Sequence, residues 1–422
     1  MREPMPGRPR AAAVAVFVTF VCNGFNVGGW AARLPAVRDE LSLSPNRVGL
    51  LLLVGASGSL VALPLSGLIV QRLGARRAVL AFAGVNTAGL LVAALGVAAS
   101  SVLLTGAGLV CFAAGIGVWD AAMNLEGAAV EQRLSRSIMP RFHAGFSLGT
   151  VAGAGVAALA AKFDVSLLAH FSVSLTLSLV GVFVCVRYYL PEGTHSGAPR
   201  ASSSRPRTTR SAMAVAAWRE RRTLLIGLMV LAAGLTEGAA ADWASLAVVD
   251  GFGTTAEIGA IGFGVFVAAM TGMRLLGTGL LDRWGRVAVL RVNAGISLVG
   301  IAAFTLAPSL GLALVGVALW GMGASLGFPV GMSAAADEQP MAPARIAVVS
   351  TVGYSAFLAG PPLMGMLAEH VGYRHALLAL ALPLALGLLV AGAARPLRPA
   401  DPEGRSPALE RRGRSRRLAS GN

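Results

Sequence analysis

A basic turn that contains glycine occurs twice in this sequence of 422 residues. The first copy reads Gly67-Leu-Ile-Val-Gln71-Arg72-Leu-Gly74-Ala-Arg76-Arg77, and the second reads Thr278-Gly279-Leu-Leu-Asp282-Arg283-Trp-Gly285-Arg286. Each copy stands between two long apolar segments. Glycine lets a chain bend tightly, and arginine in a short loop favours the cytoplasmic side of a membrane. Each copy therefore predicts a tight turn between two membrane-spanning helices.

The composition outside these turns is that of a membrane protein. Hydrophobic residues make up 55% of the chain and charged residues only 13%, whereas a soluble domain carries about 25% charged residues. A helix needs about 20 apolar residues to cross the hydrocarbon core of a bilayer. An all-α membrane protein with twelve spans is predicted, at residues 11–31, 48–70, 78–99, 101–126, 142–161, 165–189, 223–247, 259–281, 287–307, 309–334, 346–368 and 373–394.

The two basic turns divide the spans into two similar halves. We expect a six-helix bundle over 1–189, a linker rich in Arg, Ser, Pro and Gly over 190–222, a second bundle over 223–394 and a disordered basic tail over 395–422. With the N-terminus inside, 29 of the 35 Lys and Arg residues fall in inner segments and five in outer loops. This asymmetry predicts that both termini and the linker are cytoplasmic.

Other classes of protein fit the sequence poorly. The net charge of +15 comes from arginines in loops and tails between the spans, so nucleic-acid binding is not expected. The three cysteines lie within apolar segments, which disfavours a disulfide framework or a metal site. We find no phosphate-binding glycine loop, zinc-binding H-E-x-x-H motif or nucleophile elbow. Neither enzyme activity nor a cofactor or metal is therefore expected.

Both basic turns resemble the G-x-x-x-D-R-x-G-R-R motif of the major facilitator superfamily. Gln71 stands where the first copy usually has aspartate, and Thr278 stands where the second usually has glycine. The resemblance implies that these turns latch the cytoplasmic gate, because their acidic residue can pair with arginines or a helix end. The residues it assigns to this gate are Gly67, Gln71, Arg72, Gly74, Arg76, Arg77, Asp282, Arg283, Gly285 and Arg286.

A closer resemblance links the chain to bacterial permeases near the fucose-permease branch, which includes sugar–proton symporters. It rests on Trp119-Asp120-Ala-Ala-Met123-Asn124, Ile138-Met139-Pro140-Arg141-Phe142-His143, Thr236-Glu237-Gly238-Ala-Ala-Ala-Asp242-Trp243 and Gly353-Tyr354 with Gly360-Pro361-Pro362. It implies two six-helix bundles around a central cavity and alternating access by rocking. It also implies a monomer in a bacterial cytoplasmic membrane, in contact with membrane lipid.

The fifth span carries a ladder of small residues, Gly145, Gly149 and Gly153. One face of this helix is therefore flat and suited to close packing. Drug–proton antiporters of the superfamily usually have a Gly-Pro motif in this span, and no proline occurs here. The departure weighs against drug efflux.

Carboxylates inside spans are costly and usually functional. Glu237 lies near the middle of the seventh span, 45 residues before Asp282, just as Asn26 lies 45 residues before Gln71. First helices of each half line the cavity in this superfamily, so we predict that Glu237 binds the coupling proton or the substrate. The alternative is a structural carboxylate that is paired within its bundle.

Asp120 is the second candidate for the proton. Asp120 and Asn124 are four residues apart and share one face of the fourth span. In the resemblance, a carboxylate on this helix belongs to the proton or sugar pathway. Asn124 is accordingly a candidate for the substrate cavity.

Asn23, Asn26 and Trp30 form one stripe on the first span, at positions i, i+3 and i+7. Two amides and an indole would suit a neutral polyol in the cavity. Amides in a membrane also hydrogen-bond neighbouring helices, so interhelical packing is the alternative role.

Four further residues are candidates for the cavity, each with an alternative. Asp242 lines the substrate cavity, or it acts in a gate or in helix packing. Trp243 stacks on a sugar ring, or it anchors its helix at the membrane–water interface. Arg274, which lies well inside the eighth span, needs a counter-charge, and Glu237 on the adjacent helix can supply it. Otherwise Arg274 binds an anionic substrate. Tyr354 lines the cavity or packs.

The leading hypothesis is a secondary transporter that couples protons to the movement of a small polar solute, such as a sugar or polyol. Its partners are then the solute, protons and lipid. The alternative is a proton-coupled exporter of amphipathic compounds or metabolites in the same fold.

Overall fold

The computed structural model describes residues 8–134, 138–191, 213, 215–337 and 341–396, and helices account for nearly all of them. The helices of the first half are α1 (Arg8–Ala32), α2 (Leu34–Glu40), α3 (Pro45–Leu73), α4 (Ala75–Ala98), α5 (Val102–Leu134), α6 (Met139–Lys162), α7 (Leu167–Cys185) and the short η1 (Val186–Tyr188). The helices of the second half are α9 (Arg221–Phe252), α10 (Ala256–Leu306), α11 (Leu310–Ala324), α12 (Gly327–Ala335), α13 (Ala342–Ala376), η3 (Leu377–Leu380), α14 (Ala381–Val390) and η4 (Ala391–Ala394).

The predicted twelve spans are confirmed. Eleven stretches of the described residues are long and apolar enough to cross a membrane, and the last of them, Ala344–Ala394, is 51 residues long. That stretch is interrupted at Gly372, where the backbone is not helical, so it holds two spans. The tenth span consists of α11 and α12 with a break between them.

Three glycines make the sharpest turns between spans. Gly74, Gly285 and Gly372 have φ values of 78°, 74° and 77° and ψ values of 158°, 163° and 158°. Residues with a side chain almost never adopt these φ and ψ values, so glycine is required at these positions. The sequence predicts the turns at Gly74 and Gly285, whereas Gly372 lies in no recognised motif.

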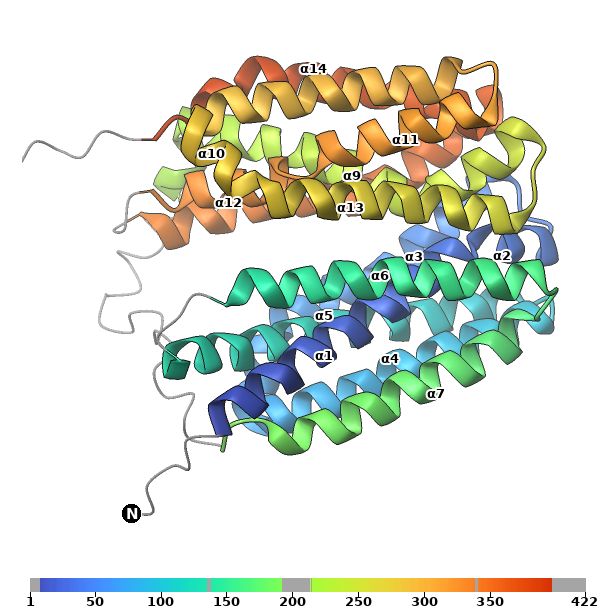
Figure 1. Ribbon diagram of the computed structural model, residues 1–422, viewed down its shortest axis with the longest axis horizontal. Coiled ribbons are helices and arrows are strands. Elements are labelled where there is room, and N and C mark those ends of the chain that lie inside the picture. Colours follow the sequence, from blue (N-terminus) through green and yellow to red (C-terminus); the bar gives the residue numbers. More distant parts are fainter. Residues whose placement is uncertain (1–7, 135–137, 192–212, 214, 338–340, 397–422) are drawn as a thin grey trace, which may run out of the picture.

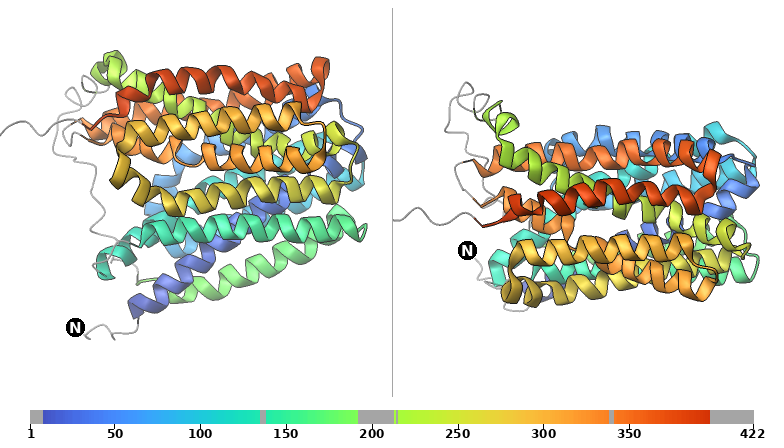
Figure 2. Two further views of the ribbon diagram at one scale, coloured as in Figure 1. Left: turned by 45° about the horizontal axis from the view of Figure 1, so that its top comes forward. Right: turned by 90° about the horizontal axis from the view of Figure 1, so that it is seen from above.

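The two halves form two side-by-side layers (Figures 1 and 2). Within the first half, the predicted glycine ladder of α6 packs against α1. A Cβ atom on Gly149 would lie 2.0 Å from the Val21 carbonyl oxygen, and one on Gly153 would lie 2.2 Å from that of Phe25. Between the halves, α3 packs against α13 and α6 packs against α10.

The molecule has two distinct ends along its helices. The start of α1, the end of α7, the start of α9 and the end of α14 lie at the same end of the molecule, which we call the linker end (Figure 1). We call the other one the opposite end. Most of the predicted linker (192–212 and 214) and most of the predicted tail (397–422) lie outside the described residues.

The halves are joined at the opposite end. Arg38 of α2 forms an ion pair with Asp250 of α9 at 2.5 Å, and Lys162 pairs with Glu257 at 3.8 Å. Close to the first pair, the Ser245 hydroxyl donates to the Ala31 carbonyl at 3.1 Å. Both ion pairs cross between the halves, so the two halves are closed against each other at this end.

Candidate functional site

An ion pair lies near mid-span in the second half. Arg274 of α10 donates from Nη2 to both carboxylate oxygens of Glu237 on α9, at 3.0 and 2.9 Å. The side chains are 30% and 27% exposed, so neither is sealed in the bundle. The pairing expected from the sequence is therefore confirmed, and each charge has its counter-charge.

Arg274 also explains how the break in the tenth span is tolerated. Pro329 of α12 has no N–H group, so the carbonyl four residues earlier, that of Ser325, loses its helical partner. The Nε of Arg274 donates to this carbonyl at 3.0 Å, and the Asn293 amide donates to the Ser325 hydroxyl at 3.1 Å. Irregular backbone at membrane depth is found where it lines a cavity or is buried in protein. Sequence reasoning missed Ser325, although Pro329 was a signal for it.

Asp120 and Asn124 contact each other on α5, as their spacing predicts. The Asn124 amide donates to the backbone and side-chain oxygens of Asp120, at 2.9 and 3.2 Å. Among the described residues, Asp120 has no ion-pair partner. Tyr354 of α13 is 50% exposed and lies within electrostatic range of Asp120. These two residues therefore lie near each other although they belong to different halves.

The stripe on the first span faces into its own bundle. The Asn26 amide donates to Asn86 of α4 at 2.8 Å, and both side chains are buried. Trp30 packs against Phe112, with ring centroids 6.2 Å apart. Asn23 is also buried, and its amide has no hydrogen-bond partner in the structure. Asn26 and Trp30 therefore connect helices of the first half, and all three side chains are buried.

Asp242 and Trp243 are separated from the Glu237 pair. Trp243 is 1% exposed and packs on Tyr373 with ring centroids 5.6 Å apart. Asp242 is partly buried, and no described residue forms an ion pair or hydrogen bond with it. The structure therefore places Trp243 in the interior of the second bundle and leaves Asp242 uncompensated.

The gate residues of the two basic turns lie at the linker end. In the first turn Gly67, Gln71, Arg72, Arg76 and Arg77 are exposed. In the second turn Asp282 and Arg283 are exposed too, and Arg283 lies over the Trp284 ring. Asp282, the predicted latch carboxylate, has no partner among the described residues.

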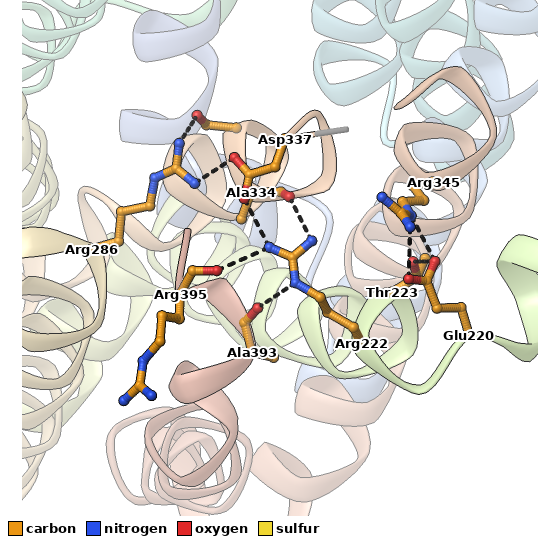
Figure 3. A network of polar contacts seen from close by, with 10 residues as sticks. Glu220, Arg222, Thr223, Arg286, Ala334, Asp337, Arg345, Ala393 and Arg395 are labelled. Atoms are coloured by element: carbon orange, nitrogen blue, oxygen red, sulfur yellow. Dashed lines mark hydrogen bonds and ion pairs between the residues drawn. The ribbon is translucent and has the colours of Figure 1, made fainter. Parts of the chain in front are cut away.

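Arg286 belongs to a polar network that sequence reasoning missed (Figure 3). It donates to Asp337 at 2.7 Å and to the Ser333 hydroxyl at 3.1 Å. Arg222 at the start of α9 donates to the other oxygen of Asp337 at 2.8 Å and to the carbonyl oxygen of Ala393 at 3.1 Å. The network ties the linker ends of the second-half helices together. The residues of this network lie far apart in the sequence. The only signal for it in the sequence is that each of them stands near the end of a span.

A second pair in this region joins α9 to α13. Arg345 donates to the two carboxylate oxygens of Glu220, at 2.6 and 2.9 Å. Burial acts to raise the pKa of Glu220, but hydrogen bonds from Arg345 and Thr223 outweigh it and hold this pKa below its ordinary value. The carboxylate is thus charged at neutral pH and fixes the start of α9.

Long apolar helices in two halves, with an ion pair and unpaired carboxylates inside them, are typical of a membrane transporter. The family model that matches residues 16–344 is that of the Major Facilitator Superfamily. The chain belongs to this superfamily.

Relatives and solved structures agree with this assignment. An uncharacterised transporter of Sinorhizobium fredii, y4wD, is 33% identical over 84% of this chain and 90% of its own length. The membrane protein MosC of Rhizobium meliloti is 28% identical over 92% of this chain and 90% of its own length.

Three solved transporters share the fold. The nucleoside transporter NupG has a TM-score of 0.70 at 14% identity, with 92% of this chain and 98% of that one covered. The D-xylose–proton symporter has a TM-score of 0.67 at 13% identity, covering 91% and 97%. The E. coli fucose–proton symporter FucP has a TM-score of 0.59 at 16% identity, covering 92% and 98%. These likenesses concern the fold alone, and they do not single out the fucose-permease branch.

Proposed function

We propose that this transporter couples proton movement to the movement of a small polar solute, such as a sugar or polyol. It acts as a monomer in a bacterial cytoplasmic membrane, with its linker end and both termini in the cytoplasm. The observation that carries the proposal is the contrast between two carboxylates near mid-span. Glu237 is neutralised by Arg274, whereas Asp120 has only the amide of Asn124.

This contrast suggests how a proton acts. Rocking to the other state closes the linker end and removes water from the mid-span groups. Burying an unpaired carboxylate is costly, while burying a neutral carboxylic acid with an amide partner costs much less. A proton on Asp120 therefore favours the change of state, and a ligand shifts such an equilibrium by its differential affinity for the two states.

The same contrast supports an uncharged solute. The charge of Arg274 is already compensated, because both carboxylate oxygens of Glu237 accept from its Nη2, so an anionic solute would compete with that carboxylate. The amide of Asn124, the phenol of Tyr354 and the carboxylates offer hydrogen bonds to hydroxyl groups. Two of the structural neighbours carry the names of sugar–proton symporters, which agrees with this solute class.

The test is a solute panel. Proteoliposomes that hold the full-length protein and an internal pH indicator receive neutral sugars, polyols, sugar acids and amphipathic cations in turn. We expect a neutral sugar or polyol to move protons. Proton movement with amphipathic cations alone would contradict the proposal and would favour a proton-coupled exporter of amphipathic compounds. Sugar flux without proton movement would contradict the coupling.

A further inference from the structure

A basic cavity lies at the linker end of the first half, away from the transport path. It has a volume of about 790 Å³ and lies between the start of α1, the start of α4 and the segment from η1 to Pro191. Arg76, Arg77 and Arg187 all line it. None of the residues described in its lining is acidic.

Two of the three arginines in this cavity, Arg76 and Arg187, have no acidic partner among the described residues. Arg76 is exposed and pairs with no described carboxylate. Arg187 is exposed as well, and its guanidinium lies 4.4 Å from the centroid of the Phe183 ring. An anion, and phosphate in particular, fits this set of donors.

Exposed apolar side chains surround the cavity. Tyr188, which lines it, is 57% exposed, and Phe183, whose ring lies under the Arg187 guanidinium, is 46% exposed. Leu73, just before the glycine that begins α4, is 37% exposed. Exposed aromatic rings at the end of a span mark the level of the headgroups. The arginines therefore sit at the depth where lipid phosphates lie.

We propose that this cavity binds the phosphate group of an anionic phospholipid from the leaflet at the linker end. Arg76 and Arg187 hold the phosphate, and Tyr188 and Phe183 contact the glycerol and the upper acyl chains. Basic pockets between spans on the cytoplasmic side suit such headgroups. A bound lipid would tie the first basic turn to the end of α7.

The exposed apolar rim favours a lipid over a free phosphate. A free anion would contact only the arginines, and it would leave the exposed rings of Tyr188 and Phe183 without an apolar partner. A lipid satisfies both parts of the site at once.

Native mass spectrometry of the full-length protein tests this proposal. The protein in detergent is titrated with phosphatidylglycerol, with phosphatidylcholine and with inorganic phosphate. The variant Arg76→Gln/Arg187→Gln is compared with Arg283→Gln/Arg291→Gln, which removes the same charge from exposed positions at the same end of the second half. Thermal unfolding of both variants confirms that they fold.

We expect the affinity for phosphatidylglycerol to fall roughly 30-fold in the first variant, on the basis of two surface arginines, and to hold in the second. Phosphatidylcholine should bind more weakly than phosphatidylglycerol, and millimolar inorganic phosphate should not displace the lipid. Equal phosphatidylglycerol binding by the two variants would overturn the proposal. Displacement by inorganic phosphate would also overturn it, in favour of a soluble-anion site.

Discussion

At the scale of the residue, one arginine holds three parts of the second half together. Arg274 joins α10 to Glu237 on α9 and to the Ser325 carbonyl at the break of the tenth span. The sequence predicts the first contact, because a lone arginine inside a span requires a counter-charge. The second contact depends on how α11 and α12 lie in space, and spacing along the chain does not contain that information.

The Glu237–Arg274 pair should behave as a coupled unit in stability measurements. Glu237→Gln leaves the arginine uncompensated and Arg274→Gln leaves the carboxylate uncompensated, so each single change should lower the unfolding temperature. The double variant should recover part of the loss, with a coupling energy of about 1–2 kcal/mol. Thermal unfolding in detergent measures all four proteins. Strictly additive losses would contradict a direct pair.

The amides on α1 mark where sequence reasoning stops at this scale. The spacing of Asn23, Asn26 and Trp30 predicts a shared face but not what that face meets. The structure turns Asn26 toward Asn86 on α4, a residue that no motif singles out. Tertiary packing decides which neighbour a helix face contacts, and the sequence of that one helix does not contain this information.

At the scale of the element, glycine turns set the boundaries of the spans. Gly74 and Gly285 adopt the same backbone conformation in corresponding turns of the two halves. Their motif therefore predicts local geometry correctly. Gly372 adopts this conformation too, at the opposite end, but a single glycine among 53 in the sequence carries no such signal.

Replacing a turn glycine should cost more than replacing a helical one nearby. Gly285→Ala places a Cβ on a residue with φ of 74° and should destabilise the protein by about 1–3 kcal/mol. Gly279→Ala is the matched control, because Gly279 is helical and a Cβ there meets nothing within 4 Å. Thermal unfolding in the same detergent compares them. Similar unfolding temperatures for the two variants would show that the turn is not strained by a side chain.

At the scale of the whole molecule, the twelve-span count and the two halves follow from hydropathy and the repeated turn. The conformational state does not, because it depends on pairs such as Arg38 and Asp250, which are 212 residues apart. Burial disfavours the charge on Arg38, but its contacts with Asp250 and Asp39 outweigh this and raise its pKa. Arg38 therefore remains charged at every physiological pH, so a change of pH does not break the contact between the halves by deprotonating this residue.

The Arg38–Asp250 pair should bias the molecule toward the state that is closed at the opposite end. Asp250→Asn weakens a contact between the halves, whereas Asp39→Asn weakens a contact of the same arginine within one half. Spin labels at positions 163 and 255, after removal of the three cysteines, report the separation of the halves. We expect longer distances to gain population in Asp250→Asn only. An equal shift in both variants would show that the Arg38–Asp250 pair does not hold the opposite end closed.

The central claim is that Asp120 carries the coupling proton, and one comparison tests it most directly. Proteoliposomes with wild type, Asp120→Asn and the exposed control Asp164→Asn are assayed for solute counterflow and for accumulation driven by a pH gradient, using the solute that the panel identifies. We expect Asp120→Asn to keep counterflow, because its amide resembles the protonated acid, and to lose accumulation, while Asp164→Asn keeps both. Accumulation by Asp120→Asn at the wild-type level would contradict it.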